Sequence, residues 1–409
     1  MPLSNLASKW RGLSFATKCA ILVWCFAVVL PLTRAALAPH VNSVYVIFVQ
    51  AARHWSAGQD LYQVSYEPFR YSPLVAVTFE PFSWLPDWLG GVSWRLLGAA
   101  IFLAALGWFC QGLLPASLSV NQRSVLFILA SPLCVGNLNN GQSNLLMIGL
   151  LVAALSAGMK ERWNLASFCV ALAVLFKIYP VVVGLLLMLL YPRRFGFRFL
   201  GMLSAGLALP FLFQSPSYVL EQYAGWLRHL ESNDRQLLPQ GLWYIDMRLL
   251  FRLWIVPISY QGFFVVQAVT GLVIALVCWL AKKAFWPREK ELILVLGLAC
   301  CWMTAFGPAS ESATYVLLAP IASWLFLVSF QAQSPWWQRT LCFAGYGLLL
   351  ASQLANWIPG GKIFQGWGPQ PLAALLFLVG ILAEFVVNLL SAQKCKWPDV
   401  RTACPPQIA

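Results

Sequence analysis

Polar side chains stand at the ends of apolar runs between residues 137 and 180, and these are the positions where the chain could do chemistry. The segment reads NLNNGQSNLLMIGLL, then a short basic turn, then ALAVLFKIYPVVVGLLL. A charged side chain at the centre of a membrane helix costs about 2.5–3.5 kcal/mol, so Lys177 is expected to meet a specific partner. A partner with negative charge and a lipid tail indicates chemistry at a membrane surface. The alternative is a lysine whose stem lies along the lipid while its ammonium reaches the interface.

A second group of reactive side chains follows the first apolar run. Asp60, Glu67 and Arg70 lie close together in the sequence, next to Tyr71. Just upstream, residues 44–62 carry apolar or small side chains at helical spacing with polar ones opposite, which predicts an amphipathic helix that ends near Gly58. Two carboxylates beside an arginine are better evidence for a site than the neighbouring aromatic residues, which are common at membrane interfaces.

The composition is that of a membrane protein. The chain has 409 residues, of which 60% are hydrophobic and 10% are charged, and its mean hydropathy is +0.71. A soluble domain would carry about 25% charged residues. The net charge of +13 does not indicate nucleic-acid binding, because the basic residues fall in short clusters between apolar runs, as in cytoplasmic loops of membrane proteins.

The elements that must position these residues are the apolar runs, and we predict an all-α polytopic fold in a single domain with about twelve membrane-spanning helices. They are expected at roughly residues 16–36, 89–112, 124–137, 143–158, 164–176, 178–191, 198–214, 262–281, 291–307, 313–331, 339–357 and 370–392. Several are shorter than the roughly 17–25 residues of an ordinary span. Short spans are tolerated where their ends line a cavity.

Charge decides whether residues 164–190 form one span or two. A break at residues 177–180 places both termini and most of the 27 Lys and Arg residues on one side, as the positive-inside rule requires. Pro180 also disfavours a helix through the preceding residue. We therefore predict cytoplasmic termini, with Asn140, Lys177 and two long loops, residues 37–88 and 215–261, on the outer face. A cleaved signal peptide is the alternative for the first run, and its loss would invert this topology.

Several classes of mechanism have no support in the sequence. The eleven cysteines lie in apolar runs or in the C-terminal tail, not in the two long outer loops where disulfides would form. The three histidines lack metal-ligand spacing, and no CxxC, HExxH or Walker motif occurs. No dense cluster of carboxylates calls for a divalent ion. We expect neither a metal nor a cofactor.

Taken in order, several segments resemble glycosyltransferase family 87, the polyprenyl-phosphate-dependent mannosyltransferase-like branch of the GT-C glycosyltransferases. The resemblance is carried by AARHWSAGQDLY and FRYSP in the first loop, NNGQSNLLMIGLLVAAL, LFKIYP before a basic turn, Asn233–Gln236, and Gly307–Glu311. It is good from about residue 40 to residue 200 and weaker afterwards. That family includes bacterial α-1,2-mannosyltransferases of glycolipid synthesis.

The resemblance implies a GT-C fold in the plasma membrane with its active site on the outer face. It also implies inverting transfer of a hexose, mannose in many members, from a polyprenyl-phosphate donor to a lipid or glycan acceptor. Lys177 and Arg70 would meet the donor phosphate. The sugar and acceptor would be held by Tyr71, Asn140, Gln142, Asn144, Asn233 and Gln236. The alternative for the amides is an ordinary outer turn with hydrogen bonds between helices.

The catalytic base is the point where the chain departs from the family pattern. The family carries an aspartate just before the amphipathic helix, whereas residues 39–45 here read PHVNSVY and contain no acid. A general base is still needed to accept the proton of the acceptor hydroxyl. Glu67, Asp60 and Glu311 are the candidates, with Glu67 marginally preferred because it adjoins Arg70, and Glu311 close behind.

Two other functions remain open at this level. A transporter or flippase for a lipid-linked or anionic solute would use the same charges, but transporters usually contain paired repeats with matching broken helices. The second half of the chain shows no counterpart of the break at residues 177–180. A ligase or phosphotransferase for a lipid-linked glycan would transfer a larger group.

Overall fold

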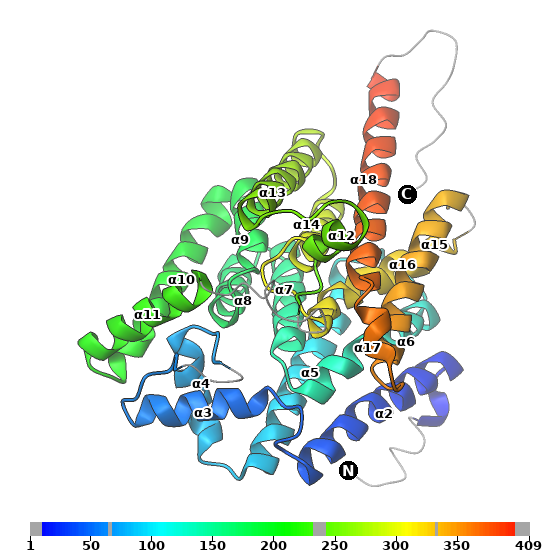
Figure 1. Ribbon diagram of the computed structural model, residues 1–409. Helices are drawn as coiled ribbons and strands as arrows, with labels where there is room; N and C mark the ends of the chain where they lie inside the picture. The colour runs from blue at the N-terminus through cyan, green and yellow to red at the C-terminus, as the bar shows by residue number, and fades with distance from the viewer. Residues whose placement is uncertain (1–9, 64–67, 232–242, 332–333, 397–409) are drawn as a thin grey trace, which may run out of the picture.

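The computed structural model describes residues 10–63, 68–231, 243–331 and 334–396, and these residues form helices without a single strand (Figure 1). The expected all-α fold is therefore confirmed. In chain order the helices are α2 (Phe15–Leu37), α3 (Tyr45–Ser56), α4 (Pro73–Ser83), α5 (Asp87–Gly112), α6 (Val120–Asn140), α7 (Asn144–Met159), α8 (Trp163–Phe176), α9 (Val181–Leu190), η1 (Pro192–Gly196), α10 (Phe197–Ala208), η2 (Leu209–Leu212), α11 (Pro216–Glu231), α12 (Met247–Trp254), α13 (Tyr260–Lys283), α14 (Arg288–Ala305), η4 (Ser312–Leu318), α15 (Ala319–Ser329), α16 (Trp336–Ala355), α17 (Gly361–Gln365) and α18 (Pro369–Lys396).

Each expected span coincides with a helix, and the protein is a multi-pass membrane protein. Within the described ranges, six segments are long and apolar enough to cross a bilayer: Phe15–Leu37, Asp87–Gly112, Pro192–Leu212, Tyr260–Lys283, Ser312–Ser329 and Pro369–Leu390. Three further apolar helices, α7, α8 and α9, are shorter. Short helices of this kind persist because other helices cover them, so their ends can stop inside protein instead of in lipid.

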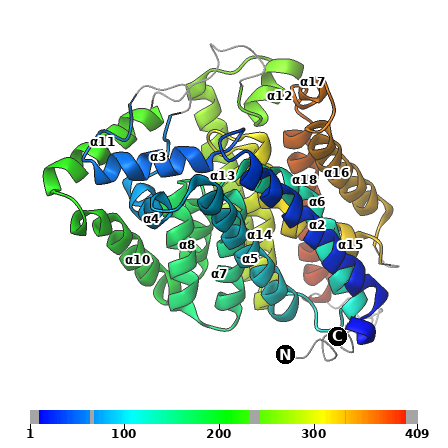
Figure 2. The same ribbon diagram turned by 90° about the horizontal axis from the view of Figure 1, so that it is seen from below.

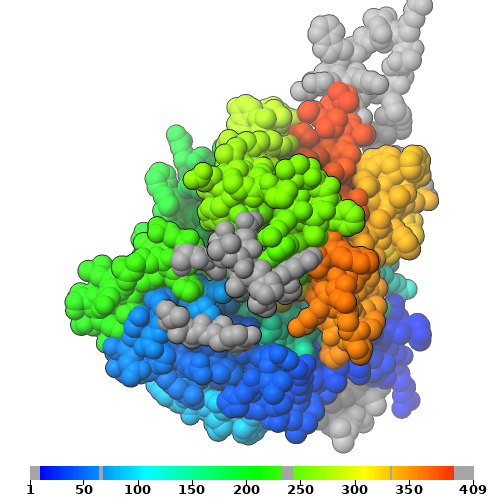
Figure 3. Space-filling view, viewed as in Figure 1, coloured from blue at the N-terminus to red at the C-terminus, as the bar shows by residue number. Residues whose placement is uncertain are grey.

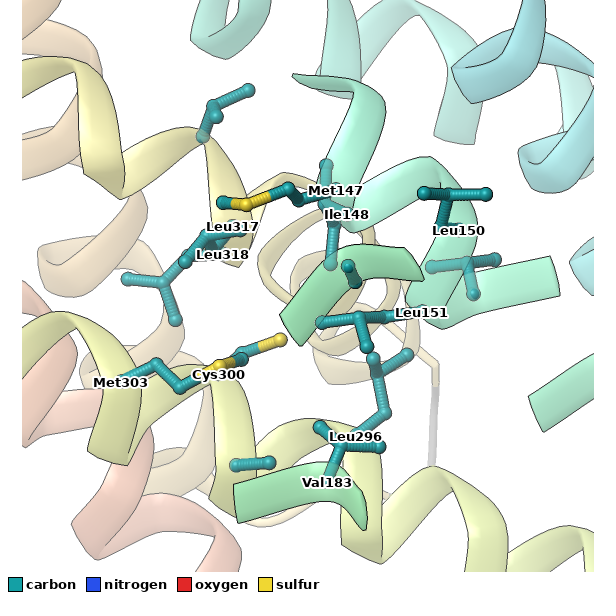
Figure 4. Close-up of a cluster of buried hydrophobic side chains, with 14 of the residues drawn as sticks. Met147, Ile148, Leu150, Leu151, Val183, Leu296, Cys300, Met303, Leu317 and Leu318 are labelled. Atoms are coloured by element: carbon teal, nitrogen blue, oxygen red, sulfur yellow. The ribbon is translucent and has the colours of Figure 1, made fainter. Parts of the chain in front are cut away.

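The core is built around α7. Nearly every residue of this helix is buried, as expected for a helix that is apolar on all sides. It packs against α5, α8, α14 and η4. Figure 4 shows the side chains that meet there from α7, α9, α14 and η4, among them Met147, Ile148, Leu150, Leu151, Val183, Leu296, Cys300, Met303, Leu317 and Leu318. The polar N-terminus of α7 is thereby held rigidly in the middle of the molecule.

The break between α8 and α9 is confirmed. Helix α8 ends at Phe176, Lys177 is extended (φ −146°, ψ 144°), and Pro180 caps α9. At the far ends of these helices, Glu161 in the α7–α8 turn pairs with Arg194 at 2.9 Å and with Arg288 at 2.8 Å. The basic turns after α7, after α9 and before α14 therefore meet at one end of the bundle. We call this the ion-pair end.

The opposite end carries the helices that lie across the bundle. Figure 2 shows α3 and α11 lying across this end, with α12 and α17 nearby, while α5, α7, α8 and α14 run side by side beneath them. The apolar face predicted for residues 44–62 is present but shorter, because α3 ends at Ser56 before Gly58, whose φ is +66°. That face is buried against α4 and α5. Helix α4, which the sequence did not predict, covers it. We call this the cavity end.

Candidate active site

A cavity of about 560 Å³ opens at the cavity end, above the junction of α6 and α7. In the space-filling view, teal atoms of this junction are visible between the blue first loop and the orange segment around α17 (Figure 3). Most of the lining is polar, and three cations face one carboxylate across it. The lining residues with charged or amide side chains are Arg34, Asn42, Arg70, Asn139, Asn140, Gln142, Glu311, Gln353, Asn356 and Lys362.

The floor of the cavity is the turn between α6 and α7, and a buried arginine fixes it. Gly141 ends α6 in the left-handed conformation (φ +68°), where an added Cβ would lie 2.9 Å from the Arg95 guanidinium. Arg95 is only 4% exposed. It donates to the carbonyls of Leu138 (2.8 Å), Asn139 (3.1 Å) and Gly91 (3.0 Å) and to the Ser43 hydroxyl (3.1 Å). The bonds to Leu138 and Asn139 help to satisfy carbonyls in the last turn of α6, where the helix itself provides few amide donors.

A chain of hydrogen bonds links Lys177 to Glu311. The Lys177 ammonium donates to Asn144 Oδ1 at 2.8 Å, Asn144 Nδ2 donates to Gln142 Oε1 at 2.6 Å, and Gln142 Nε2 donates to Glu311 Oε2 at 3.0 Å. Because an ammonium can only donate, Asn144 must turn its oxygen to Lys177 and its NH₂ to Gln142. The same reasoning turns the NH₂ of Gln142 to the carboxylate. Two neutral amides therefore orient Glu311 and hold it apart from Lys177.

Glu311 is placed by the loop that leads into η4. Gly307 begins this loop where a Cβ would lie 2.1 Å from the Met303 carbonyl oxygen, and Ala309 has a positive φ of 58°. Strained backbone of this kind persists only where the surrounding structure holds it. Glu311 caps η4, its side chain accepting from the Thr314 amide while its own amide donates to the Thr314 hydroxyl. N-capping alone is a structural role, but this carboxylate also lines the cavity.

The two expected phosphate-binding cations have different surroundings. Arg70 and Tyr71 line the cavity, and Arg70 donates to the Tyr244 hydroxyl at 2.9 Å. Lys177 lies behind them in the break between α8 and α9, with its ammonium 5.6 Å from the centre of the Tyr71 ring. Burial lowers the pKa of Lys177 to about 8, and the Glu311 carboxylate acts in the opposite direction. Arg70 can therefore contact a ligand directly, whereas Lys177 supplies positive charge from beneath the cavity wall.

The remaining predicted residues fall into three groups. Asn140 and Gln142 line the cavity, and Asn144 lies beneath it in the hydrogen-bonded chain. Asp60 is exposed, accepts a hydrogen bond from the Tyr62 amide, and is not part of the cavity lining. Glu67, Asn233 and Gln236 lie outside the described residues, although Pro68, directly after Glu67, lines the cavity.

Sequence reasoning missed seven residues at this site, among them Asn139, Gln353 and Asn356, whose amide side chains line the cavity. Arg34 and Lys362 line the cavity from α2 and α17, Asn42 lines it just before α3, and Arg95 holds its floor. The available signal was an isolated charge in an apolar run, the criterion that found Lys177. Arg95 within residues 89–112 and Arg34 at the end of the first run both meet it. Nothing in the sequence marks Lys362, because its position depends on how α17 packs against α16 and α18.

The family of this protein follows from a match over the central part of its sequence. The model of glycosyltransferase family 87 matches residues 69–308, which is more than half of the chain. The protein belongs to glycosyltransferase family 87. The resemblance to glycosyltransferase family 87 drawn from the sequence is thereby confirmed. The matched region contains the floor of the cavity, Arg70 and Lys177, whereas Arg34, Glu311 and Lys362 lie outside it.

Curated relatives of this family 87 protein are mannosyltransferases. It is 32% identical to GPI mannosyltransferase 1 of Trypanosoma brucei brucei over 147 residues, which is 34% of this chain and 32% of the relative. It is 31% identical to GPI mannosyltransferase 1 of Aspergillus oryzae over 144 residues, which is 34% of this chain and 33% of that one. The similarity thus spans about a third of the length of these relatives.

Among solved structures, the chain is similar to ArnT from Cupriavidus metallidurans bound to undecaprenyl phosphate. The TM-score is 0.37 and the sequence identity is 15%, with 93% of this chain and 78% of that chain covered. Within the part of the chain that the structure describes, no group of three or more His, Cys, Asp and Glu side chains could hold a metal ion.

Proposed function

We propose that this family 87 enzyme transfers a hexose, with mannose as the first candidate, from a polyprenyl-phosphate donor to a lipid or glycan acceptor. The reaction would take place at the outer face of the plasma membrane. Support for the sugar comes from the mannosyltransferase relatives. Support for an anionic donor comes from the positive cavity wall, where Arg70 lines the cavity with Lys177 behind it. The single observation that carries the proposal is the hydrogen-bonded chain that presents Glu311 to this cavity.

Glu311 is the catalytic base in this proposal. Its carboxylate accepts the proton of the acceptor hydroxyl as that oxygen forms its bond to the anomeric carbon. The bond between the anomeric carbon and the phosphate oxygen breaks, and the polyprenyl phosphate leaves with the electron pair. Attack from the face opposite the phosphate inverts the anomeric configuration. A positioned base contributes roughly 10²–10⁴-fold to such a step.

The cations act on the departing phosphate. Arg70 contacts its oxygens, and Lys177 stabilises the developing negative charge from beneath Tyr71. Fixed positive charge aimed at charge that appears in the transition state is worth about 10²–10³ in rate per group. The amide groups of Asn140 and Gln142 and the Tyr71 ring line the remaining wall and hold the sugar. Asn144 orients Gln142 from below.

Glu311 is preferred as the base over the other two carboxylates. It lines the cavity and is oriented by Gln142, whereas Asp60 is exposed and absent from the lining. Glu67 remains a prediction, because it lies outside the described residues. This reverses the order suggested by sequence proximity to Arg70.

The test is transfer by the purified protein in lipid nanodiscs from radiolabelled polyprenyl-phosphate mannose to membrane glycolipids. Glu311→Gln keeps the size and the cap of η4, so we expect it to bind donor normally and to lose at least about 10²-fold in turnover. Glu80→Gln is the matched control, since Glu80 accepts a hydrogen bond from the Ser56 hydroxyl at the C-terminal end of α3 and is not part of the cavity lining, so this variant should leave turnover unchanged. Near-normal transfer by Glu311→Gln would overturn the assignment of the base. Failure of the unmodified protein to use any polyprenyl-phosphate sugar would favour transport instead.

A further inference from the structure

A short segment before α12, residues 244–246, contacts both sides of the proposed reaction centre and has no role in the mechanism above. On one side, the Tyr244 hydroxyl accepts a hydrogen bond from an Arg70 guanidinium nitrogen at 2.9 Å. On the other side, the Ile245 amide donates to the carbonyl of Ser310, the residue before the proposed base, at 2.8 Å. We call residues 244–246 the bridging segment.

The bridging segment is anchored to the loop that carries Glu311. The Ile245 carbonyl accepts a hydrogen bond from the buried Tyr315 hydroxyl at 2.8 Å. Both backbone polar groups of Ile245 therefore pair with residues on either side of Glu311 in the chain. Asp246 ends the segment as the buried N-cap of α12 and accepts from the Leu249 amide at 3.3 Å. A buried network whose groups are satisfied is rigid, so the segment has a fixed position relative to the Glu311 loop.

The Arg70 side chain depends on this segment for its direction. Arg70 lies outside the helices, just before α4, and a free arginine side chain samples many rotamers. Its guanidinium carries the N–H donors in a rigid planar fork. The bond from one nitrogen to Tyr244 therefore sets the plane in which the other donors point. Tyr244 itself is not among the described residues that line the cavity, so any effect on a ligand passes through Arg70.

We propose that Tyr244 is a positioning residue that fixes the Arg70 guanidinium relative to the Glu311 carboxylate. This inference rests on the proposed glycosyltransferase function, in which Arg70 holds the departing phosphate and Glu311 takes the proton of the attacking hydroxyl. The attacking and leaving oxygens lie on opposite faces of the anomeric carbon, so the two groups must keep a set separation. The bridging segment maintains that separation, because neighbouring residues bond to Arg70 and to the Glu311 loop.

The test is a double-mutant cycle on Tyr244→Phe and Arg70→Gln. Undecaprenyl phosphate is titrated against each purified protein, and turnover is measured in nanodiscs. Tyr244→Phe keeps the ring and removes the hydroxyl. We expect it to weaken lipid binding about tenfold and to lower turnover at least as much, because hydrogen bonds to charged groups are strong. In the Arg70→Gln background the same change should cost less than about twofold, since no guanidinium is left to position.

Tyr218→Phe is the matched control, because its hydroxyl donates to the Gln59 carbonyl at 2.6 Å and it does not line the cavity. This variant should keep normal binding and turnover. Equal losses from Tyr244→Phe in both backgrounds would overturn the proposal, since they would reveal a structural role that does not involve Arg70. Unchanged binding and turnover in Tyr244→Phe would overturn it as well.

The lipid titration needs no turnover, which separates this inference from the proposed function. Absent transfer by the unmodified protein, with the expected cycle in lipid binding, would overturn the proposed function and leave Tyr244 as the residue that positions Arg70. Absent lipid binding by the unmodified protein would overturn both.

Discussion

Glu161 and Glu291 at the ion-pair end and Glu311 at the cavity end are arranged in opposite ways relative to the nearby cations. At the ion-pair end, Glu161 contacts Arg194 and Arg288 directly in exposed pairs, and buried Glu291 contacts Lys282 at 3.1 Å. At the cavity end, Asn144 and Gln142 stand between Lys177 and Glu311. Charges in direct contact neutralise each other and join helices. Charges held apart by amides stay fixed in position and available to a ligand, which is the arrangement that catalysis requires.

The largest expected contrast between the two ends is their access to the outside of the cell. Gln59, after α3 at the cavity end, and Lys160, at the ion-pair end, are both exposed. In a background without the eleven cysteines, an impermeant maleimide should label Gln59→Cys in intact cells. Lys160→Cys should react only after the membrane is opened. The reverse pattern would place the cavity in the cytoplasm, and labelling of both sites from outside would contradict the two-ended arrangement.

The next contrast concerns Lys177. Lys177→Ala removes the cation beneath Tyr71 and lets the side-chain amide of Asn144 flip. The rate of sugar transfer should therefore fall by about 10²–10³, while donor binding weakens less. Arg194→Ala at the ion-pair end removes an exposed cation and should leave turnover unchanged. Nearly normal transfer by Lys177→Ala would mean that this lysine only reaches for the membrane interface.

The pH profile separates the charge of Lys177 from its shape. Because the pKa of Lys177 is lowered to about 8, its charge is present below that pH and lost above it. Turnover of the unmodified protein should therefore decline as the pH rises through about 8. Lys177→Arg should keep part of the activity and move this decline to higher pH, because a guanidinium stays protonated. If the turnover of Lys177→Arg falls over the same alkaline pH range as that of the unmodified protein, another group causes the decline.

The smallest effect is expected at Glu161. The hydrogen bond from Arg288 and the charge of Arg194 hold the pKa of Glu161 below its usual range. Its contribution to stability is therefore present above its usual pKa and is lost as the pH falls through the lower folded value. At pH 7, Glu161→Gln should lower the thermal midpoint by no more than about 2 °C and leave transfer unchanged, because exposed pairs contribute little.

Glu291→Gln is the buried comparison at the same end. It weakens the bonds to Tyr191 and Lys282 and should lower the thermal midpoint clearly more than Glu161→Gln does, since breaking a buried pair leaves a charge without its partner. Loss of transfer without loss of stability in either variant would contradict the assignment of this end to structure alone.

The membrane fold could be predicted from the sequence because its signals are local. Apolar runs are long compared with the turns between them, and the basic clusters mark one side of the membrane, so the helix limits near residues 176 and 181 agree with the prediction. Helix α4 could not be found in the same way. Its sequence PLVAVTFEPFS contains an internal proline and is shorter than a span, and it forms a helix because α3 and α8 cover it.

The sequence by itself determined the class of the protein, its family, the broken helix at Lys177 and the identity of most polar groups near the cavity. These follow from hydropathy, charge and ordered motifs, which are properties of neighbouring residues. Only the tertiary structure decided that Glu311, far along the chain from Gln142, shares a hydrogen bond with it, that Asp60 lies outside the cavity, and that Arg34 and Lys362 enter it. The physical reason is that α7 is buried on all sides, so the helices around it bring distant residues together through packing rather than through any local pattern.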